Sequence, residues 1–260
     1  MRIYIVTAKE IEWDIPFDHK LITVGSYKKQ GAMYAADYIG SQMNSQRTFA
    51  FYRGVAAALE DIKEADENDH ILVAPHRVYL GKNLSTDLYT VFNDQLGRRK
   101  IITPDTLNQS WKSEILTEFP DGYDMVIARP FSVGSAIVRQ HAAAHHLDDL
   151  LFGMACAVRA ELISSDLAAY TLANPYLIDP LFATKISIYR EIFQKILWIG
   201  KEFFNKYSLP RSGYQERAIN FVLERILSAY LFEKVYVQKV PTLCSHLVHI
   251  DKDMEYTRTE

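Results

Sequence analysis

Two polar residues at the end of a buried strand are the first candidates for chemistry. In "DHILVAPHRVYL", residues 69–80, the apolar run 70–74 predicts a strand, and Pro75, His76 and Arg77 follow it. Ligands of open α/β sheets bind outside the carboxyl ends of strands. An arginine can hold a phosphate through two parallel hydrogen bonds, and a histidine can donate a third. The stretch therefore predicts a diphosphate site, with a surface salt bridge of Arg77 as the alternative.

A second polar group lies in "HAAAHHLDDLL", residues 141–151. His141 and His145 are four positions apart, so a helix presents both on one face. The H-E-x-x-H pattern of zinc enzymes is absent. Asp148 and Asp149 follow at the start of the next predicted helix, where a carboxylate interacts favourably with the first turn. A carboxylate beside an imidazole is also an arrangement that serves as a general base.

Three charges interrupt the most apolar predicted helix of the chain. Arg217 and Glu224 are seven positions apart and share a face, and Arg225 is adjacent to Glu224. Charges in an apolar helix are costly unless they are paired. We expect Glu224 to form an internal ion pair that ties this helix to the sheet, whereas Arg217 or Arg225 could instead reach a phosphate.

Strand and helix patterns divide the chain into two halves. The first half reads as α/β, with strands, a helix and a loop in sequential order, and the second half reads as mostly helical. No linker or internal repeat separates them, so we expect one domain. The predicted strands are residues 2–8, 20–25, 70–74, 123–130 and 235–241; the predicted loop is 25–45; the predicted helices are 48–65, 111–119, 133–146, 147–162, 166–174, 187–209 and 213–234.

Composition narrows the class of protein. The 260 residues are 48% apolar with a net charge of -3, which gives no basic excess and argues against a nucleic-acid partner. Cys156 and Cys244 lie among apolar residues, as reduced buried thiols of a cytoplasmic protein do. No apolar run is long enough to predict a spanning helix. The amphipathic helix 187–209 is expected to pack on the core, with a membrane surface as the alternative.

Taken together, these stretches resemble a bacterial family of capsular and exopolysaccharide biosynthesis proteins, commonly described as glycosyltransferases. The resemblance covers nearly the whole chain. The positions that match the family pattern are Lys9, Asp37, Gly40, Arg77, Tyr79, His145, Asp148, Asp149, Arg217, Phe221, Glu224 and Arg225. The chain departs from that pattern at Ala8, Phe51, Val78 and Pro180, where the family has histidine, glutamate, arginine and asparagine, and the family's histidine is displaced by one position to His76.

The resemblance implies a GT-A-like (Rossmann-like) fold, an α/β mixed sheet flanked by helices with a mostly helical C-terminal half. It implies one glycosyltransferase domain over residues 1–260, with a nucleotide-sugar-binding half at 1–130 and an acceptor-side half at 131–260. The implied reaction moves a sugar from a nucleotide-diphosphate sugar, with UDP as the family default, to a glycan or lipid-linked glycan in capsule, O-antigen or exopolysaccharide synthesis. The implied location is the cytoplasm, with peripheral contact at the inner membrane left open.

Site residues follow from the same resemblance. Asp149 or Asp148, with His145 nearby, is expected to be the base for the acceptor hydroxyl. GT-A enzymes usually carry D-x-D and a metal where this chain has His76 and Arg77, so we expect protein cations to neutralise the leaving diphosphate, with no metal ligand and no required cofactor. The residues expected to bind the nucleotide sugar are Thr7, Ala8, Lys9, Asp37, Gly40, His76, Arg77, Arg217 and Arg225.

Two other interpretations stay open. The departures from the family pattern fit a catalytically inactive GT-A-like binding or assembly subunit of a polysaccharide synthesis complex. A metal-dependent hydrolase using His141, His145 and Asp149 is the third.

Overall fold

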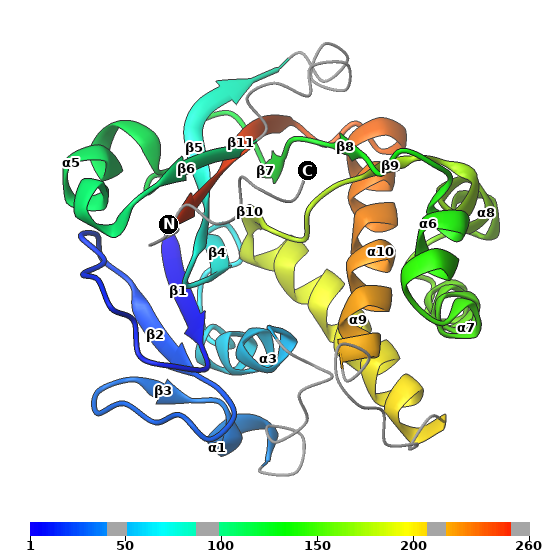
Figure 1. Ribbon diagram of the computed structural model, residues 1–260, viewed down its shortest axis with the longest axis horizontal. Coiled ribbons are helices and arrows are strands. Elements are labelled where there is room, and N and C mark those ends of the chain that lie inside the picture. The colour runs from blue at the N-terminus through cyan, green and yellow to red at the C-terminus, as the bar shows by residue number, and fades with distance from the viewer. Residues whose placement is uncertain (41–50, 87–98, 207–216, 251–260) are drawn as a thin grey trace.

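A mixed β-sheet forms the centre of the protein, and long helices pack against it (Figure 1). The computed structural model describes residues 1–40, 51–86, 99–206 and 217–250. The strands are β1 Arg2–Thr7, β2 Lys20–Thr23, β3 Met33–Tyr34, β4 His70–Pro75, β5 Val78–Ser85, β6 Arg99–Ile102, β7 Met125–Ala128, β8 Phe131–Ser132, β9 Tyr176–Leu177, β10 Phe182–Lys185 and β11 Thr242–Ile250. The helices are α1 Ala36–Ile39, α3 Tyr52–Asp61, α5 Pro104–Glu114, α6 Ile137–Ala144, α7 Leu147–Arg159, α8 Ser165–Ala173, α9 Ile186–Lys206, α10 Ala218–Phe232 and the π-helix η3 Glu233–Val237.

The directions of the strands determine the edge of the sheet at which most of them end. Within the described residues the strand order is β3-β2-β1-β4-β10-β7-β11-β5, and β6 pairs with β11. β1, β2, β3 and β4 are parallel; β10 is antiparallel to both β4 and β7; and β11 is parallel to β7 and β6. The carboxyl ends of all these strands except β10 therefore meet at one edge. β10 and β5 run the other way, so they begin at that same edge.

Both faces of the sheet are covered, so its central strands read as continuous apolar runs. In β1, Tyr4 and Val6 point into the larger core, which α3, α7, α9 and α10 complete. Ile3 and Ile5 alternate with them and point into the second core, to which α5 contributes Leu107. The expected mixed sheet flanked by helices is confirmed.

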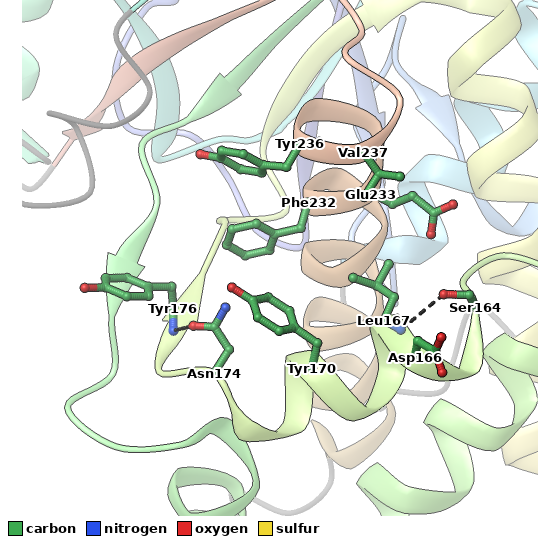
Figure 2. Close-up of a pocket in the computed structure, with 10 residues that line it drawn as sticks. All are labelled: Ser164, Asp166, Leu167, Tyr170, Asn174, Tyr176, Phe232, Glu233, Tyr236 and Val237. Atoms are coloured by element: carbon green, nitrogen blue, oxygen red, sulfur yellow. Dashed lines mark hydrogen bonds between the residues drawn. The ribbon is translucent and has the colours of Figure 1, made fainter.

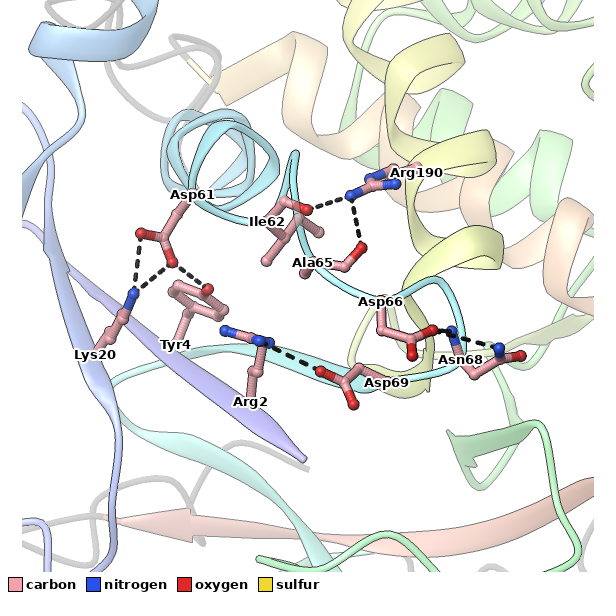
Figure 3. Close-up of polar contacts among 10 residues, drawn as sticks. All are labelled: Arg2, Tyr4, Lys20, Asp61, Ile62, Ala65, Asp66, Asn68, Asp69 and Arg190. Carbon is pink, nitrogen blue, oxygen red and sulfur yellow. Dashed lines mark hydrogen bonds and ion pairs between the residues drawn. The ribbon is translucent and has the colours of Figure 1, made fainter.

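Side-chain contacts tie the amino edge of the sheet to α3 and α9 (Figure 3). Asp61, at the end of α3, accepts hydrogen bonds from Tyr4 Oη at 2.5 Å and from Lys20 Nζ at 2.7 Å. Arg190 of α9 donates to the carbonyl of Ile62 and pairs with Glu67. These contacts fix the helices at the edge opposite to the one where the strands end.

Several predicted elements are confirmed, with ends shifted by a few residues. They are the strands beginning at Arg2, Lys20, His70 and Met125, and the helices α3, α6, α7, α8, α9 and α10. The predicted ends at 48–50, 207–209 and 213–216 lie outside the described residues. The long helix α9 packs into the larger core through residues such as Phe193, Ile196 and Phe203, as expected. None of the helices in the described ranges has the length and hydropathy needed to cross a bilayer.

The predicted loop at 25–45 and the predicted helix at 111–119 were wrong in their extent. β3 and α1 lie within 25–40, where buried Ala35 donates a backbone hydrogen bond to Thr23; residues 41–45 lie outside the described part. The helix α5 begins earlier, because Pro104 fits its first turn. It ends at Glu114, because the next residue, Ile115, forms an isolated antiparallel β-bridge with Gly81. The strands β5, β6, β9 and β10 were missed.

The final strand was placed wrongly. Residues 233–237 continue the helical path of α10 as a π-helix, closed by a hydrogen bond from Gln238 N to Glu233 O at 2.9 Å. The last strand is β11, whose polar residues hid its pattern. Ser245 Oγ donates to the Gly81 carbonyl at 2.7 Å, and the His246 ring occupies the space above Gly81. These side chains are buried because partner strands lie on both sides of β11.

Close packing of α7 on α10 gives a stability prediction. A Cβ on Gly153 would lie 2.1 Å from Cγ1 of Val222. We expect Gly153→Ala to lower the free energy of unfolding by about 1–2 kcal/mol, because overpacking outweighs the gain in helix propensity. Urea unfolding measures this effect.

The matched control is Gly153→Ala combined with Val222→Ala, which opens space for the added methyl group. The double variant is expected to lose less stability than the sum of the two single changes. Strictly additive losses would mean that the two side chains do not compete for the same space.

Candidate functional site

A cavity of about 370 Å³ opens at the edge where the strands end. Its walls come from the start of α3, the end of β4, the start of β5, the paired strands β8 and β9, the loop before β10, the end of β11 and the first turns of α10. The lining residues are Phe51, Tyr52, Pro75, Val78, Phe131, Leu177, Ile178, Asp179, Pro180, Leu181, Arg217, Asn220, Glu224 and His249. The cavity therefore lies where the strand directions place a ligand site.

Two carboxylates, those of Glu224 and Asp179, line the cavity and have different hydrogen-bond partners. Glu224 retains 31% exposure of its side chain, accepts a hydrogen bond from Asn220 Nδ2 and lies 3.5 Å from an Arg225 nitrogen. Burial raises the pKa of Glu224 from 4.5 to about 7, and the Asp179 carboxylate contributes, while Arg225 and Arg217 oppose the rise. The Asp179 carboxylate accepts a hydrogen bond from Leu181 N at 3.1 Å. A carboxyl group with a pKa near neutrality can both take and return a proton.

The first turns of α10 explain why these groups gather. Arg217 is exposed at the start of the helix, and its guanidinium lies over the Phe221 ring at 5.3 Å. One face of α10 lines the cavity with Arg217, Asn220 and Glu224. The spacing in the sequence predicted that Arg217 and Glu224 share this face. Glu224 pairs with its neighbour Arg225 on the same helix, so this ion pair does not tie α10 to the sheet as expected.

The turn after β4 is held by its neighbours on both sides. His76 N donates to Val6 O of β1 at 3.1 Å, and Ile250 N of β11 donates to Arg77 O at 2.8 Å. Tyr79 Oη donates to the His76 carbonyl at 2.9 Å. Pro75 and Val78 flank this turn and line the cavity, whereas His76 and Arg77 are not among the lining residues. The turn is therefore fixed next to the cavity.

Charge at this turn comes from arginine and lysine. Burial lowers the pKa of His76 to about 4, helped by the positive charges of Arg77 and Lys9, so its ring is neutral at pH 7. His76 Nε2 and Arg77 Nε are buried and have no hydrogen-bond partner among the described residues. Buried donors are rarely left unbonded in proteins. The turn thus offers bonding capacity and positive charge to an anion.

Other predicted donor residues lie along the same edge. Thr7 ends β1, and its hydroxyl donates to the Lys9 carbonyl at 2.6 Å, which orders the loop that exposes Ala8 and Lys9. Asp37 and Gly40 are exposed on α1, after the end of β3. They lie further along the sheet and are not among the residues that line the cavity.

The predicted catalytic group lies elsewhere. Asp149 is 1% exposed in α7 and Asp148 is exposed beside it, while the His145 ring stacks on Phe221 at 4.0 Å. None of these three residues lines the cavity. The structure brings Asp149, Asp148 and His145 to the same junction of α6, α7 and α10, apart from His76 and Arg77.

Arg225 belongs to that junction as well. Its guanidinium donates to Phe221 O at 2.9 Å and to Gln140 Oε1 at 3.0 Å. His141 is fully buried, and burial lowers its pKa to about 3, with the positive charge of Arg225 as the next cause. Within the described ranges, no three His, Cys, Asp or Glu side chains are grouped so that they could hold a metal ion, so the three-ligand site of a metal-dependent hydrolase is not found there.

Sequence reasoning missed part of the cavity. Asp179 precedes a strand too short to recognise, so nothing marked it. Tyr52 opens α3, and its buried Oη has no hydrogen-bond partner among the described residues. Arg129, which directly follows β7, also has a buried Nε without such a partner. The sequence contained a signal for Arg129, because the predicted strand at 123–130 ends in Arg129 and Pro130.

Comparisons with known proteins support the fold. No protein-family model matches the chain. No curated protein matches it either. Among solved structures, the chain is similar to the apo structure of WbbM, a bifunctional glycosyltransferase, with a TM-score of 0.70 and 15% sequence identity. The match covers 96% of this chain and 45% of that one, so the chain spans less than half of its structural relative. The fold is thus GT-A-like, as the sequence resemblance implied.

The raised pKa of Glu224 predicts a pH-dependent stability. A folded-state pKa of about 7 against 4.5 means that this group's contribution is complete below pH 4.5 and is lost as the pH rises through 7. Glu224→Gln is neutral at every pH and removes this loss. We expect the Tm advantage of Glu224→Gln over the parent protein to grow between pH 5 and pH 8, as measured by scanning calorimetry.

Glu202→Gln is the matched control, because Glu202 pairs with Arg159 at 2.8 Å on the surface of α9. Its Tm difference from the parent is expected to change little over the same range. A Tm difference for Glu224→Gln that also stays flat would mean that Glu224 keeps an ordinary pKa.

Proposed function

We propose that this chain is a glycosyltransferase that moves a sugar from a nucleotide-diphosphate sugar to a hydroxyl of a glycan acceptor. The observation that carries the proposal is the cavity at the carboxyl edge of a GT-A-like sheet, which is lined by a carboxyl group of near-neutral pKa, Glu224, and by the cationic Arg217. A displacement reaction at a sugar needs both: a base for the incoming hydroxyl and positive charge for the leaving group.

In the proposed reaction, the oxygen of the acceptor hydroxyl forms a bond to the anomeric carbon of the donor sugar. The bond between that carbon and the diphosphate oxygen breaks, and its electron pair stays on the diphosphate. The proton of the hydroxyl passes to a carboxylate of the protein. Every atom and charge is then accounted for without a further reactant.

The leaving diphosphate is proposed to bind at the turn after β4. Arg77 and Lys9 would supply the positive charge, and the unbonded Arg77 Nε and the neutral ring of His76 would supply hydrogen bonds. Arg217 is proposed to contribute from the other side of the cavity. Thr7, Ala8, Asp37 and Gly40 stay proposed contacts of the nucleotide, and the protein's cations take the role that a metal has in other GT-A enzymes.

Glu224 is our first candidate for the base. It lines the cavity and is ionised in part at neutral pH, whereas Asp149 is 1% exposed. Asp149, Asp148 and His145 stay as the second candidate, which requires an opening at the junction of α6 and α7. Arg225 then has the role of holding Glu224 and the end of α6 in place.

The resemblance to capsular and exopolysaccharide proteins guides the choice of substrates. It favours UDP as the nucleotide, a lipid-linked or free glycan as the acceptor, and the cytoplasmic side of the inner membrane as the place of work.

A catalytically inactive binding or assembly subunit is the second candidate function. One observation favours it: three of the four departures from the family pattern, Phe51, Val78 and Pro180, line the cavity. They replace a glutamate, an arginine and an asparagine of the family with side chains that form no hydrogen bonds. A protein that binds the nucleotide sugar without cleaving it would fit this second function.

Donor binding is tested by thermal unfolding with a panel of nucleoside diphosphates and their sugars, each with EDTA and with Mn²⁺. We expect one nucleotide to raise the Tm by roughly 5–10 °C at a hundredfold excess over its Kd, with no loss in EDTA. Arg77→Ala should remove most of that gain. Arg159→Ala, a surface arginine on α7, should keep it.

A gain in Tm that disappears in EDTA would contradict the metal-independent site. No gain with any nucleotide would contradict a nucleotide-sugar donor altogether.

Catalysis is tested by the release of nucleoside diphosphate from the stabilising donor, with water as the acceptor. Glu224→Gln is expected to lower the rate by roughly 10²- to 10⁴-fold while leaving donor binding intact, because a general base contributes about this much. Glu202→Gln serves as the control. A fully active Glu224→Gln together with an inactive Asp149→Asn would move the base to the junction of α6 and α7.

A further inference from the structure

A second and larger cavity, of about 700 Å³, lies between α8, β9 and the far end of α10 (Figure 2). Aromatic rings dominate its walls. Phe232 and Tyr236 stack on each other with ring centroids 5.5 Å apart, and Tyr170 follows them along the side of α10 while Tyr176 lies beside them on β9. A mostly apolar pocket with a few polar groups is the usual form of a small-ligand site.

The charged groups of this cavity are carboxylates. Asp166 and Glu233 line it on the side of Ser164 and Leu167, and the described residues that line the cavity include no lysine or arginine. A phosphate or another anion would meet negative charge without a positive partner. A sugar ring fits better, because its C–H faces can lie on aromatic rings while its hydroxyl groups donate to carboxylates.

One carboxylate oxygen is available for such a donor. Glu233 Oε1 accepts a hydrogen bond from Gln238 Nε2 at 3.3 Å. Glu233 Oε2 is buried and has no hydrogen-bond partner among the described residues. A buried carboxylate oxygen of this kind is costly, and a ligand hydroxyl would satisfy it.

The two-stranded sheet of β8 and β9 connects this cavity with the proposed active site. Phe131 pairs with Leu177, and both line the first cavity. The next pair is Ser132 with Tyr176, and Tyr176 lines the second cavity. Successive residues of a strand point to opposite faces, so this small sheet has one face toward each cavity.

Helix α10 spans the same two cavities. Glu224 lines the first cavity and Phe232 lines the second, and the eight positions that separate them correspond to a rise of about 12 Å along the helix. An oligosaccharide can extend over such a distance, whereas a single sugar cannot. The position therefore fits a more distant part of a glycan whose end lies in the first cavity.

We propose that the aromatic cavity binds neutral sugar rings of the acceptor glycan, away from the hydroxyl that reacts. The identification of this glycan as an acceptor rests on the proposed transferase function. The binding of sugar rings by the cavity does not, and it can be measured without any donor.

The rim of the cavity is suited to a binding test. Tyr170 is 60% exposed and Val237 is 69% exposed, so neither contributes much to the core. Replacing Tyr170 removes an aromatic surface from the cavity with little effect on folding. Trp198 of α9 is an exposed aromatic residue that lines neither cavity, which makes Trp198→Ala a matched control.

The test is saturation-transfer NMR with maltotetraose, cellotetraose and β-1,4-galactotetraose, and with tetramethylammonium as a cationic probe. We expect at least one tetrasaccharide to bind, with Tyr170→Ala weakening its Kd about tenfold. Tyr170→Phe, which keeps the ring, and Trp198→Ala should bind as the parent does. Glu233→Gln should weaken binding without lowering the Tm.

Absence of binding by all three sugars would overturn the proposal, and so would binding that Tyr170→Ala leaves unchanged. Binding of tetramethylammonium alone would assign the cavity to a cation, since acidic and aromatic groups also favour cations. The nucleotide panel on the same protein reports separately on the transferase proposal. Sugar binding without a nucleotide response would leave the aromatic site standing and remove the donor site.

Discussion

The parallel pairing of β1, β4, β7 and β11 is the constraint on which the site depends. β10 enters between β4 and β7 in the opposite direction, so those two strands stay parallel to each other. The turn after β4, the residues after β7 and the loop before β10 therefore meet at one edge. The cavity at this edge contains residues that are far apart in the sequence, such as Val78, Asp179 and His249.

The two edges of the sheet are used differently. At the amino edge, Asp61 accepts hydrogen bonds from Tyr4 and Lys20. Arg190 donates a hydrogen bond to the carbonyl of Ile62, just after the end of α3. At the carboxyl edge, buried nitrogen atoms of His76 and Arg77 lack partners among the described residues. The contacts of the amino edge hold α3 and α9 on the sheet, and the unbonded nitrogen atoms after β4 belong to the proposed donor site.

Helix α10 carries two kinds of chemistry on one rigid element. Its first turns carry Asn220 and Glu224 beside Arg217, and its last turn carries Phe232 next to the π-helix with Tyr236. The π-helix extends the aromatic side of α10 by one more turn, and local π-turns are frequent at functional sites. A glycan laid along this helix would have its reacting hydroxyl and its distant rings positioned by the same element.

Much of the chain's organisation follows from the sequence alone. Apolar runs determined β1, β4 and β7, and helical periodicity determined α7 and α9, because these signals are local. The polar turn at His76 and Arg77 marked the edge of the sheet at which the first cavity opens. Only the tertiary structure decided how these elements pair and which of their side chains are buried. β11 was hidden because Ser245 and His246 are buried only through pairing with β5 and packing over Gly81. The near-neutral pKa of Glu224 likewise depends on burial and on Asp179, which is 45 residues away in the chain, and no local pattern contains either fact.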